Sequence, residues 1–213
     1  MDSALTHVVT IFMGFFAVMN PIANTPIFLA MTADDPEDIR RAVARKALLS
    51  AFAIIVIFTV SGRLIFEMFG IGLPAFRLTG GVLVLLLGFH MLQGQKSSLQ
   101  HTEHTDAPKG YEGELAKAIT PLAMPLLAGP GTIVTAINFA SRGGLGAALV
   151  TVAVFFVLCL ITYLSFVYGE RFVRYLGHDG MSVITRLMGL ILAVIGTQMV
   201  IDGVGAAVKA FHP

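Results

Sequence analysis

Proline, glycine, asparagine and threonine gather at two places inside long apolar stretches of this 213-residue chain, and such residues can interrupt a helix and bind a solute. Residues 17–32 read AVMNPIANTPIFLAMT, with the candidate binding residues Asn20, Pro21, Asn24 and Thr25. Residues 119–137 read ITPLAMPLLAGPGTIVTAI, with the candidates Gly129, Pro130, Gly131, Thr132 and Thr135. Proline removes a backbone donor and clashes with the preceding turn, and glycine costs a helix about 1 kcal/mol. Both places therefore predict an interrupted helix.

An interrupted helix leaves backbone groups unpaired, and these groups have opposite chemical preferences. The free N–H groups at a helix start, with the positive end of the helix dipole, suit a carboxylate. Free C=O groups, together with Asn and Thr side chains, suit an ammonium group or a small cation. A zwitterionic amino acid needs both, so we predict that the two clusters face each other and form a substrate site. The alternative is that the prolines only kink two packed helices.

Titratable side chains are scarce inside the apolar stretches. His90 lies within one stretch, and Asp202 follows another. A strongly charged solute would require a buried partner, so this scarcity favours a neutral or zwitterionic solute. His90 and Asp202 could relay protons, but the preferred interpretation is that they bond to a neighbouring helix or reach the membrane surface. Cys159 with His90 is the one faint nucleophile–base pair, and we expect no enzymatic activity.

Two arginines begin equivalent apolar stretches. Arg77 and Arg186 could close ion-pair gates with Glu67 or Glu170, or they could anchor to lipid headgroups. Long basic side chains commonly extend to the membrane surface, so anchoring is the preferred interpretation.

The composition excludes a water-soluble domain. The chain is 56% hydrophobic and 13% charged with a mean hydropathy of +0.83, whereas soluble domains carry about 25% charged residues. A membrane span needs about 20 apolar residues. Six spans are predicted from charge-free runs at residues 3–33, 47–62, 78–95, 118–141, 143–169 and 187–201. The net charge of +1 gives no sign of nucleic-acid binding.

The two halves of the chain repeat each other. Arg77 and Gly94 match Arg186 and Gly203 at an offset of 109 residues, and the same offset carries Pro21 onto Pro130. Three spans in each unit reverse the orientation of the second unit, which predicts an all-α fold with a 3+3 inverted repeat and a broken first helix in each half. The units are residues 1–95 and 117–213. Inverted repeats recur in transporters, and the alternative is a duplicated bundle without a transport role. Small residues should allow close helix packing at Gly80, Gly81, Gly88, Gly189 and Gly196.

The charges predict the orientation. With six spans, four Lys and Arg residues lie on the side of the termini and ten on the other side. Basic residues favour the cytoplasmic side, so we predict both termini outside and loops at about residues 33–45, 96–116 and 170–185 inside.

The polar stretch 96–116 could be read as a metal site on His101, Glu103, His104 and Asp106. A solvated connecting loop is the preferred interpretation, and no metal site is predicted.

The motifs NPIANTPIFLAMT, PLAMPLLAGPGTI and the pair FRLTGGVLVLL and ITRLMGLIL resemble the MarC family of integral membrane proteins, which is also described as a family of small neutral amino acid transporters. The resemblance covers residues 10–203. It implies a six-span protein of the bacterial or archaeal cytoplasmic membrane that transports glycine, alanine or similar solutes with Na⁺ or H⁺ as coupling ion. Relatives often carry glycine two residues after the first proline, where this chain has Ala23, so close approach of a solute to that backbone is less favoured.

The sequence therefore predicts a secondary transporter that works by alternating access. Its expected partners are the lipid bilayer and a small solute, with no nucleic acid and no cofactor beyond a coupling ion. No GxxxxGK[ST] motif for ATP binding is present. A passive channel, an exporter of other small solutes and a membrane scaffold without transport remain open alternatives. The oligomeric state is open as well.

Overall fold

A computed structural model describes residues 3–33, 35–70, 72–94, 127–141 and 143–211 of the chain. These residues form helices and short turns, with no strand among them. The helices are α1 (Ser3–Met19), α2 (Pro21–Met31), α3 (Glu37–Phe69), α4 (Leu73–Leu92), α6 (Pro130–Ala140) and α7 (Gly144–Phe211).

Five helical stretches in the described part are long and apolar enough to cross a membrane: Leu5–Met31, Glu37–Gly62, Leu73–Leu92, Gly144–Arg171 and Gly180–Lys209. The prediction of an all-helical, multi-pass membrane protein is confirmed for these residues. Only residues 127–141 of the fourth predicted run are described, and they contain the shorter apolar helix Gly131–Ala140. The fourth predicted span therefore stays a prediction, and the predicted 96–116 loop lies outside the described residues.

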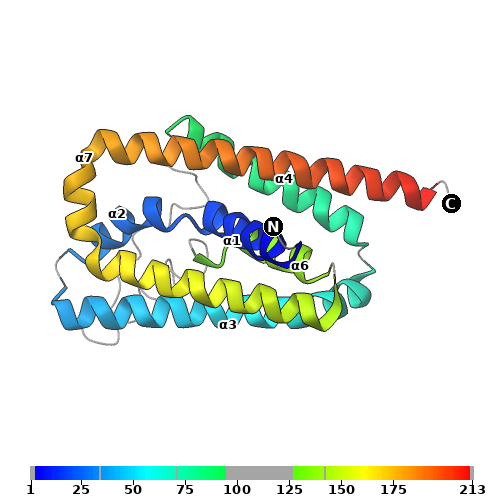
Figure 1. Cartoon of the computed structure of the whole chain (residues 1–213), viewed down its shortest axis with the longest axis horizontal. Coiled ribbons are helices and arrows are strands. Elements are labelled where there is room, and N and C mark those ends of the chain that lie inside the picture. The colour runs from blue at the N-terminus through cyan, green and yellow to red at the C-terminus, as the bar shows by residue number, and fades with distance from the viewer. Residues whose placement is uncertain (1–2, 34, 71, 95–126, 142, 212–213) are drawn as a thin grey trace.

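Helix α7 contains two of these spans because one glycine bends it. Gly177 has φ 65° and ψ −178°, a backbone conformation that side chains with a Cβ rarely adopt. In Figure 1 the ribbon of α7 runs along the bottom, turns at the left and returns across the top to the C-terminus. The predicted inside loop at 170–185 is thus mostly helix, and α3 already begins at Glu37 within the predicted loop at 33–45. Polar residues at the membrane surface continue a helix as readily as they form a loop, so charge alone did not predict these helix ends.

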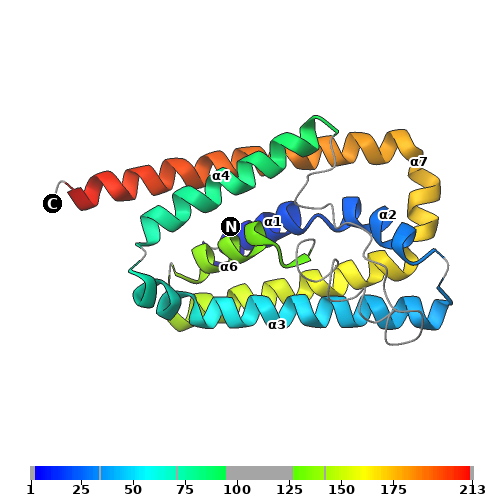
Figure 2. The ribbon, with the colours of Figure 1, turned by 180° about the vertical axis from the view of Figure 1, so that it is seen from behind.

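The helices form three layers. We call the part of α7 before Gly177 its first limb, which contains the span Gly144–Arg171, and the part after it the second limb, which contains Gly180–Lys209. Helix α3 and the first limb of α7 make one outer layer, and α4 with the second limb makes the other (Figures 1 and 2). The short elements α1, α2 and α6 lie between these layers in both views. The interrupted segments therefore occupy the middle of the molecule.

Aromatic rings fill the core between α1, α2 and the first limb of α7. The centroids of Phe15 and Phe155 lie 5.0 Å apart, and those of Phe28 and Phe166 lie 4.3 Å apart in a stacked pair. All four rings are fully buried. Lipid is as apolar as these side chains, so close packing contributes more to their association in a membrane than water exclusion does.

Glycines bring α4 and the second limb of α7 into backbone contact. A Cβ on Gly88 would lie 2.7 Å from the Gly189 carbonyl oxygen, and one on Gly81 would lie 2.8 Å from the Gly196 carbonyl oxygen. Any larger residue would push the helices apart, in agreement with the packing role expected for these four glycines. Gly80 faces α6 instead, where its Cβ would collide with Val134 at 2.1 Å.

Candidate functional site

The first predicted helix break is present at Asn20. Helix α1 ends at Met19, Asn20 takes the left-handed conformation with φ 43° and ψ 69°, and α2 begins at Pro21. Asparagine tolerates this conformation better than most residues, and proline suits the first helical position because its missing N–H would have no partner there. The Asn20 side-chain oxygen accepts a hydrogen bond from the Ala23 N–H at 3.2 Å. The Asn-Pro pair thus ends one helix and starts the next.

Two other candidates satisfy backbone groups at the break. The Asn24 side-chain amide donates to the Met19 carbonyl at 2.6 Å, and the Thr25 hydroxyl donates to the Pro21 carbonyl at 2.7 Å. The last carbonyls of a helix have no partner within it, so the Asn24 bond caps α1. These side chains therefore stabilise the interruption itself, a role that the sequence did not reveal.

The amide nitrogen of Asn20 remains without a partner. Asn20 is 3% exposed, and its Nδ2 makes no hydrogen bond. The bond from Ala23 to Oδ1 fixes which side-chain atom is oxygen and which is nitrogen. A buried, unpaired N–H donor costs about 1–3 kcal/mol, and a ligand that supplies an acceptor would remove that cost.

The second predicted break lies before α6. Leu127 and Ala128 are buried, and Gly129 has an extended backbone with φ −68° and ψ 174°. Helix α6 starts at Pro130, whose side chain lies outside the described part, and Gly131 and Thr132 occupy its first turn. No side chain caps this start, because glycine stands at the N-cap position. The Thr132 hydroxyl donates back to the Leu127 carbonyl at 3.1 Å. Pro121 and Pro125 lie outside the described residues.

Thr135 differs from most threonines of the described chain. Seven threonines donate their hydroxyl to the carbonyl four residues earlier: Thr10, Thr25, Thr32, Thr151, Thr162, Thr185 and Thr197. Thr135 is 2% exposed, and its hydroxyl has no partner, as is also true of Thr59 in α3. The Thr135 hydroxyl is therefore free to bind a ligand.

The structure brings the start of α6 next to the end of α1. A Cβ on Gly131 would lie 3.1 Å from a methyl carbon of Val18, two residues before Asn20. On the first limb of α7, the Thr162 oxygen lies 3.7 Å from the Met19 sulfur. Both predicted clusters thus border one region, although no hydrogen bond joins the polar side chains of one cluster to those of the other among the described residues.

Two of the candidate gating residues contact residues that the sequence did not suggest as partners. The Glu170 carboxylate pairs with Arg40 at 2.5 Å, and the Arg77 Nε donates to the Asn138 side-chain oxygen at 2.8 Å. Arg186 is exposed, and its guanidinium lies 3.5 Å from where a Cβ on Gly94 would be. The side chain of Glu67 lies outside the described residues. Sequence reasoning missed Arg40 and Asn138 as partners, and the one available signal for Asn138 was an amide within an apolar run.

The remaining titratable candidates are Asp202, His90 and Cys159. Asp202 accepts a hydrogen bond from Gln198 at 2.9 Å, and the Nδ1 of His90 is buried without a partner. Cys159 is buried in the apolar core. The possible metal ligands of 96–116 lie outside the described part, and within it no three His, Cys, Asp or Glu residues are grouped to hold a metal ion.

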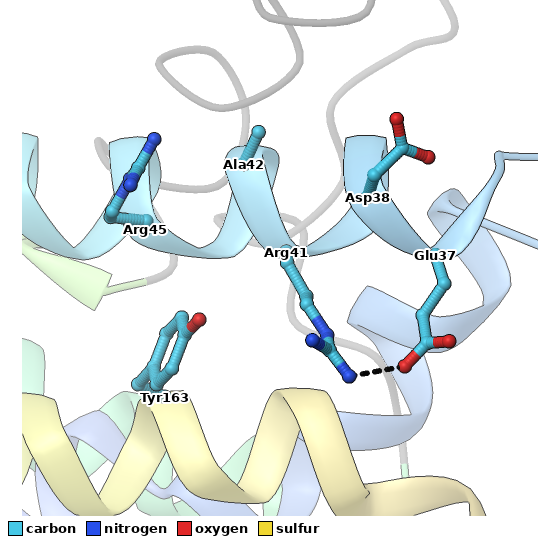
Figure 3. A pocket seen from close by; sticks show the side chains of 6 residues that line it. All are labelled: Glu37, Asp38, Arg41, Ala42, Arg45 and Tyr163. Carbon is cyan, nitrogen blue, oxygen red and sulfur yellow. Dashed lines mark hydrogen bonds and ion pairs between the residues drawn. The ribbon is translucent and has the colours of Figure 1, made fainter.

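A hollow of about 600 Å³ lies away from both breaks, between the start of α3 and the first limb of α7. Figure 3 shows the side chains that line it, and they are Glu37, Asp38, Arg41, Ala42, Arg45 and Tyr163. Tyr163 is the neighbour of Thr162, which contacts Met19 at the first break.

The helices and the interrupted first segment define a class, the multi-pass α-helical integral membrane proteins. The family model described as "MarC family integral membrane protein" matches residues 5–208. This chain belongs to the MarC family.

Similar proteins come from bacteria and archaea. The UPF0056 membrane protein YvbG of Bacillus subtilis is 39% identical over 210 residues, which cover 98% of this chain and 97% of YvbG. The UPF0056 membrane protein of Aquifex aeolicus is 35% identical, with 93% and 92% of the two chains covered. The UPF0056 inner membrane protein MarC of Escherichia coli (strain SMS-3-5 / SECEC) is 32% identical, with 91% of each chain covered. No solved structure matches this chain.

Proposed function

We propose that this protein is a secondary transporter for small neutral amino acids such as glycine and alanine, coupled to Na⁺ or H⁺. The observation that carries the proposal is the helix break at Asn20, whose buried side-chain amide donor has no partner. Val18, two residues before this break, packs against Gly131 in the first turn of α6. Irregular backbone at membrane depth is tolerated where it lines a cavity or is buried in protein, and transporters use such segments to bind solutes.

The chemistry of the two breaks fits a zwitterion. The Asn20 Nδ2, the Thr135 hydroxyl and the first N–H groups of α6 are donors that suit a carboxylate. The last carbonyls of α1 suit an ammonium group, and the bond from Asn24 can exchange for one from the solute. Na⁺ would use the same class of carbonyl and hydroxyl oxygens.

Reciprocal glycine contacts support an inverted repeat of residues 1–95 and 117–213. Gly81 precedes Gly189 by 108 residues, and Gly88 precedes Gly196 by the same number. Gly81 contacts Gly196, whereas Gly88 contacts Gly189. Such an exchange of partners is the signature of a two-fold axis, here between α4 and the second limb of α7. The 108-residue offset differs by one from the 109 that relates Arg77 to Arg186.

A second exchange involves the interrupted segments. Gly62 of α3 packs against Ile137 of α6, and Gly169 of α7 packs against Thr25 of α2. The second helix of each unit thus contacts the broken helix of the other unit. Movement of one unit against the other would change the contacts around both breaks together, as alternating access requires. The distribution of Lys and Arg supports the further proposal that both termini face outside and the 96–116 connection faces inside.

Counterflow in proteoliposomes tests the proposal. Vesicles with purified protein and unlabelled alanine, glycine or serine inside should accumulate the labelled solute from outside, with saturation, and a Na⁺ or H⁺ gradient should increase the accumulation. Thr135→Val should abolish it, whereas the matched control Thr151→Val, in a threonine bonded to its own helix, should retain it. Flux without saturation or counterflow would indicate a channel. Folded protein without flux under any gradient would contradict the proposal.

A further inference from the structure

Two arginine–glutamate pairs near the start of α3 share their chemistry and differ in what they join. Arg41 pairs with Glu37 one turn away in the same helix at 2.5 Å. Arg40 pairs at the same distance with Glu170, which is 130 residues away on the first limb of α7. The Arg40 side chain is also less exposed than that of Arg41, 18% against 51%. Only the Arg40 pair holds two helices together, and these helices belong to different units.

The Arg40–Glu170 pair ends a continuous line of contacts that starts at the first break. Along α7, Thr162 contacts Met19, Phe166 stacks on Phe28, and Gly169 packs so closely on Thr25 that a Cβ would lie 2.2 Å from its methyl carbon. Residues 162, 166, 169 and 170 follow helical spacing and share one face of α7. We call this face the inner seam. The inner seam thus runs from the first break to the Arg40–Glu170 pair.

The hollow lies on the same two helices as the Arg40–Glu170 pair. Arg41 and Arg45 of α3 line it from one side and Tyr163 of α7 from the other, as Figure 3 shows. Tyr163 and Thr162 are neighbours, so a single residue step on α7 leads from the wall of the hollow to the contact with Met19. The hollow and the Arg40–Glu170 pair therefore border the same contact between α3 and α7.

We infer that the Arg40–Glu170 pair is the latch of a gate on the basic side of the molecule, and that the inner seam is the closed gate. The inference assigns a gate to the transport site proposed above and rests on that function for its purpose. The Glu170 side chain is 55% exposed, so water screens the pair, and its loss should change the ratio of open to closed gates by up to about fivefold. A latch of this strength holds the closed state and still allows thermal opening.

Distances between two spin labels test the latch directly. Cys159 is the only cysteine, so Cys159→Ser gives a background for labels at Ala33→Cys, after α2, and Tyr175→Cys on α7, both of which are exposed. Arg40→Gln should increase the fraction of long distances by up to about fivefold over the parent. The matched control Arg41→Gln removes a pair of the same chemistry within one helix and should leave the distances unchanged.

Reversal of the charge at Arg40, alone and together with Glu170, provides a second test of the latch. Arg40→Glu should open the seam further than Arg40→Gln, because two carboxylates then repel each other, and the double variant Arg40→Glu with Glu170→Arg should restore the parent distribution. Glu170→Gln should reproduce the effect of Arg40→Gln from the α7 side. If Arg40→Gln and Glu170→Gln both keep the parent distances, the latch is contradicted.

The spin-label distances test the latch and the flux assay tests the transport function, so either claim can be contradicted without the other. Longer distances in Arg40→Gln with no solute flux in the parent would uphold the latch and overturn the transport function. Solute flux in the parent with unchanged distances in every Arg40 and Glu170 variant would uphold transport and overturn the latch.

Discussion

The two helix breaks occupy equivalent places in the two halves of the sequence, but they are built differently. At the first break, side chains supply the caps: Asn20 accepts from Ala23, and Asn24 donates to Met19. At the second, glycine precedes the proline and no side chain caps the start of α6. The side chains of the first break thus bond to its own backbone, whereas the start of α6 has no side-chain cap among the described residues. If the proposed site is correct, the start of α6 is the end that binds the carboxylate, because its N–H groups have no side-chain cap.

The largest stability effect should come from Asn20→Ala. Alanine in a left-handed conformation costs about 1–2 kcal/mol, and the lost cap adds about 0.5–2 kcal/mol. Asn20→Gly tolerates the same backbone and should lose only a few tenths of a kcal/mol, but it removes the free amide. The unfolding temperature in detergent should be lower for Asn20→Ala than for Asn20→Gly. Free alanine added as a solute should raise the unfolding temperature of neither variant. Equal stability of both variants would argue against a strained break at Asn20.

Asn24→Leu should have the next largest effect. It leaves the buried Met19 carbonyl without a donor, which costs about 1–3 kcal/mol. The counterpart Thr132→Val removes a longer bond at the second break and should cost less, about 0.5–1.5 kcal/mol, while abolishing solute-dependent stabilisation. Denaturant unfolding measures both losses, and a larger loss in Thr132→Val would reverse the proposed difference between the breaks.

Thr135→Val should lose solute binding but not stability, whereas Thr151→Val should lose stability but not solute binding. Thr151→Val breaks a bond to Ala147 and should cost about 0.5–1.5 kcal/mol. Thr135→Val removes a hydroxyl that has no partner and should be neutral or slightly stabilising. Stabilisation by added alanine should disappear in Thr135→Val and persist in Thr151→Val. If Thr135→Val destabilises as much as Thr151→Val, its hydroxyl is already bonded and is no candidate ligand.

A small gain in stability is expected for Gly129→Ser, which would give the second break the kind of cap that the first one has. Serine at an N-cap stabilises a helix over glycine by a few tenths of a kcal/mol. Its hydroxyl would occupy an N–H group of α6 and should weaken solute binding. The unfolding temperature of the variant, measured at increasing concentrations of alanine, gives its affinity for the solute. An affinity equal to that of the parent would show that the start of α6 does not bind the solute.

Much of the fold was predictable because hydropathy and length act locally. Apolar runs predicted the five described spans, and the proline and asparagine cluster at residues 17–32 predicted an interruption within the first of them. The turn at Gly177 was not predicted, because nothing in the local sequence distinguishes this glycine from Gly169, which lies inside a helix. The partners of Arg40 and Arg77 depend on tertiary packing, since they lie 130 and 61 residues away in the chain. The bond from the Asn24 amide to the Met19 carbonyl was not predicted either, because an amide near a helix break can bond to the backbone as well as to a ligand.

Direct binding of labelled alanine to purified protein tests whether the two breaks form one solute site. The parent and Thr151→Val should bind with the same saturable affinity, whereas Asn20→Gly, folded and nearly as stable as the parent, should not bind. Binding to Asn20→Gly with the affinity of the parent would contradict the site at the first break.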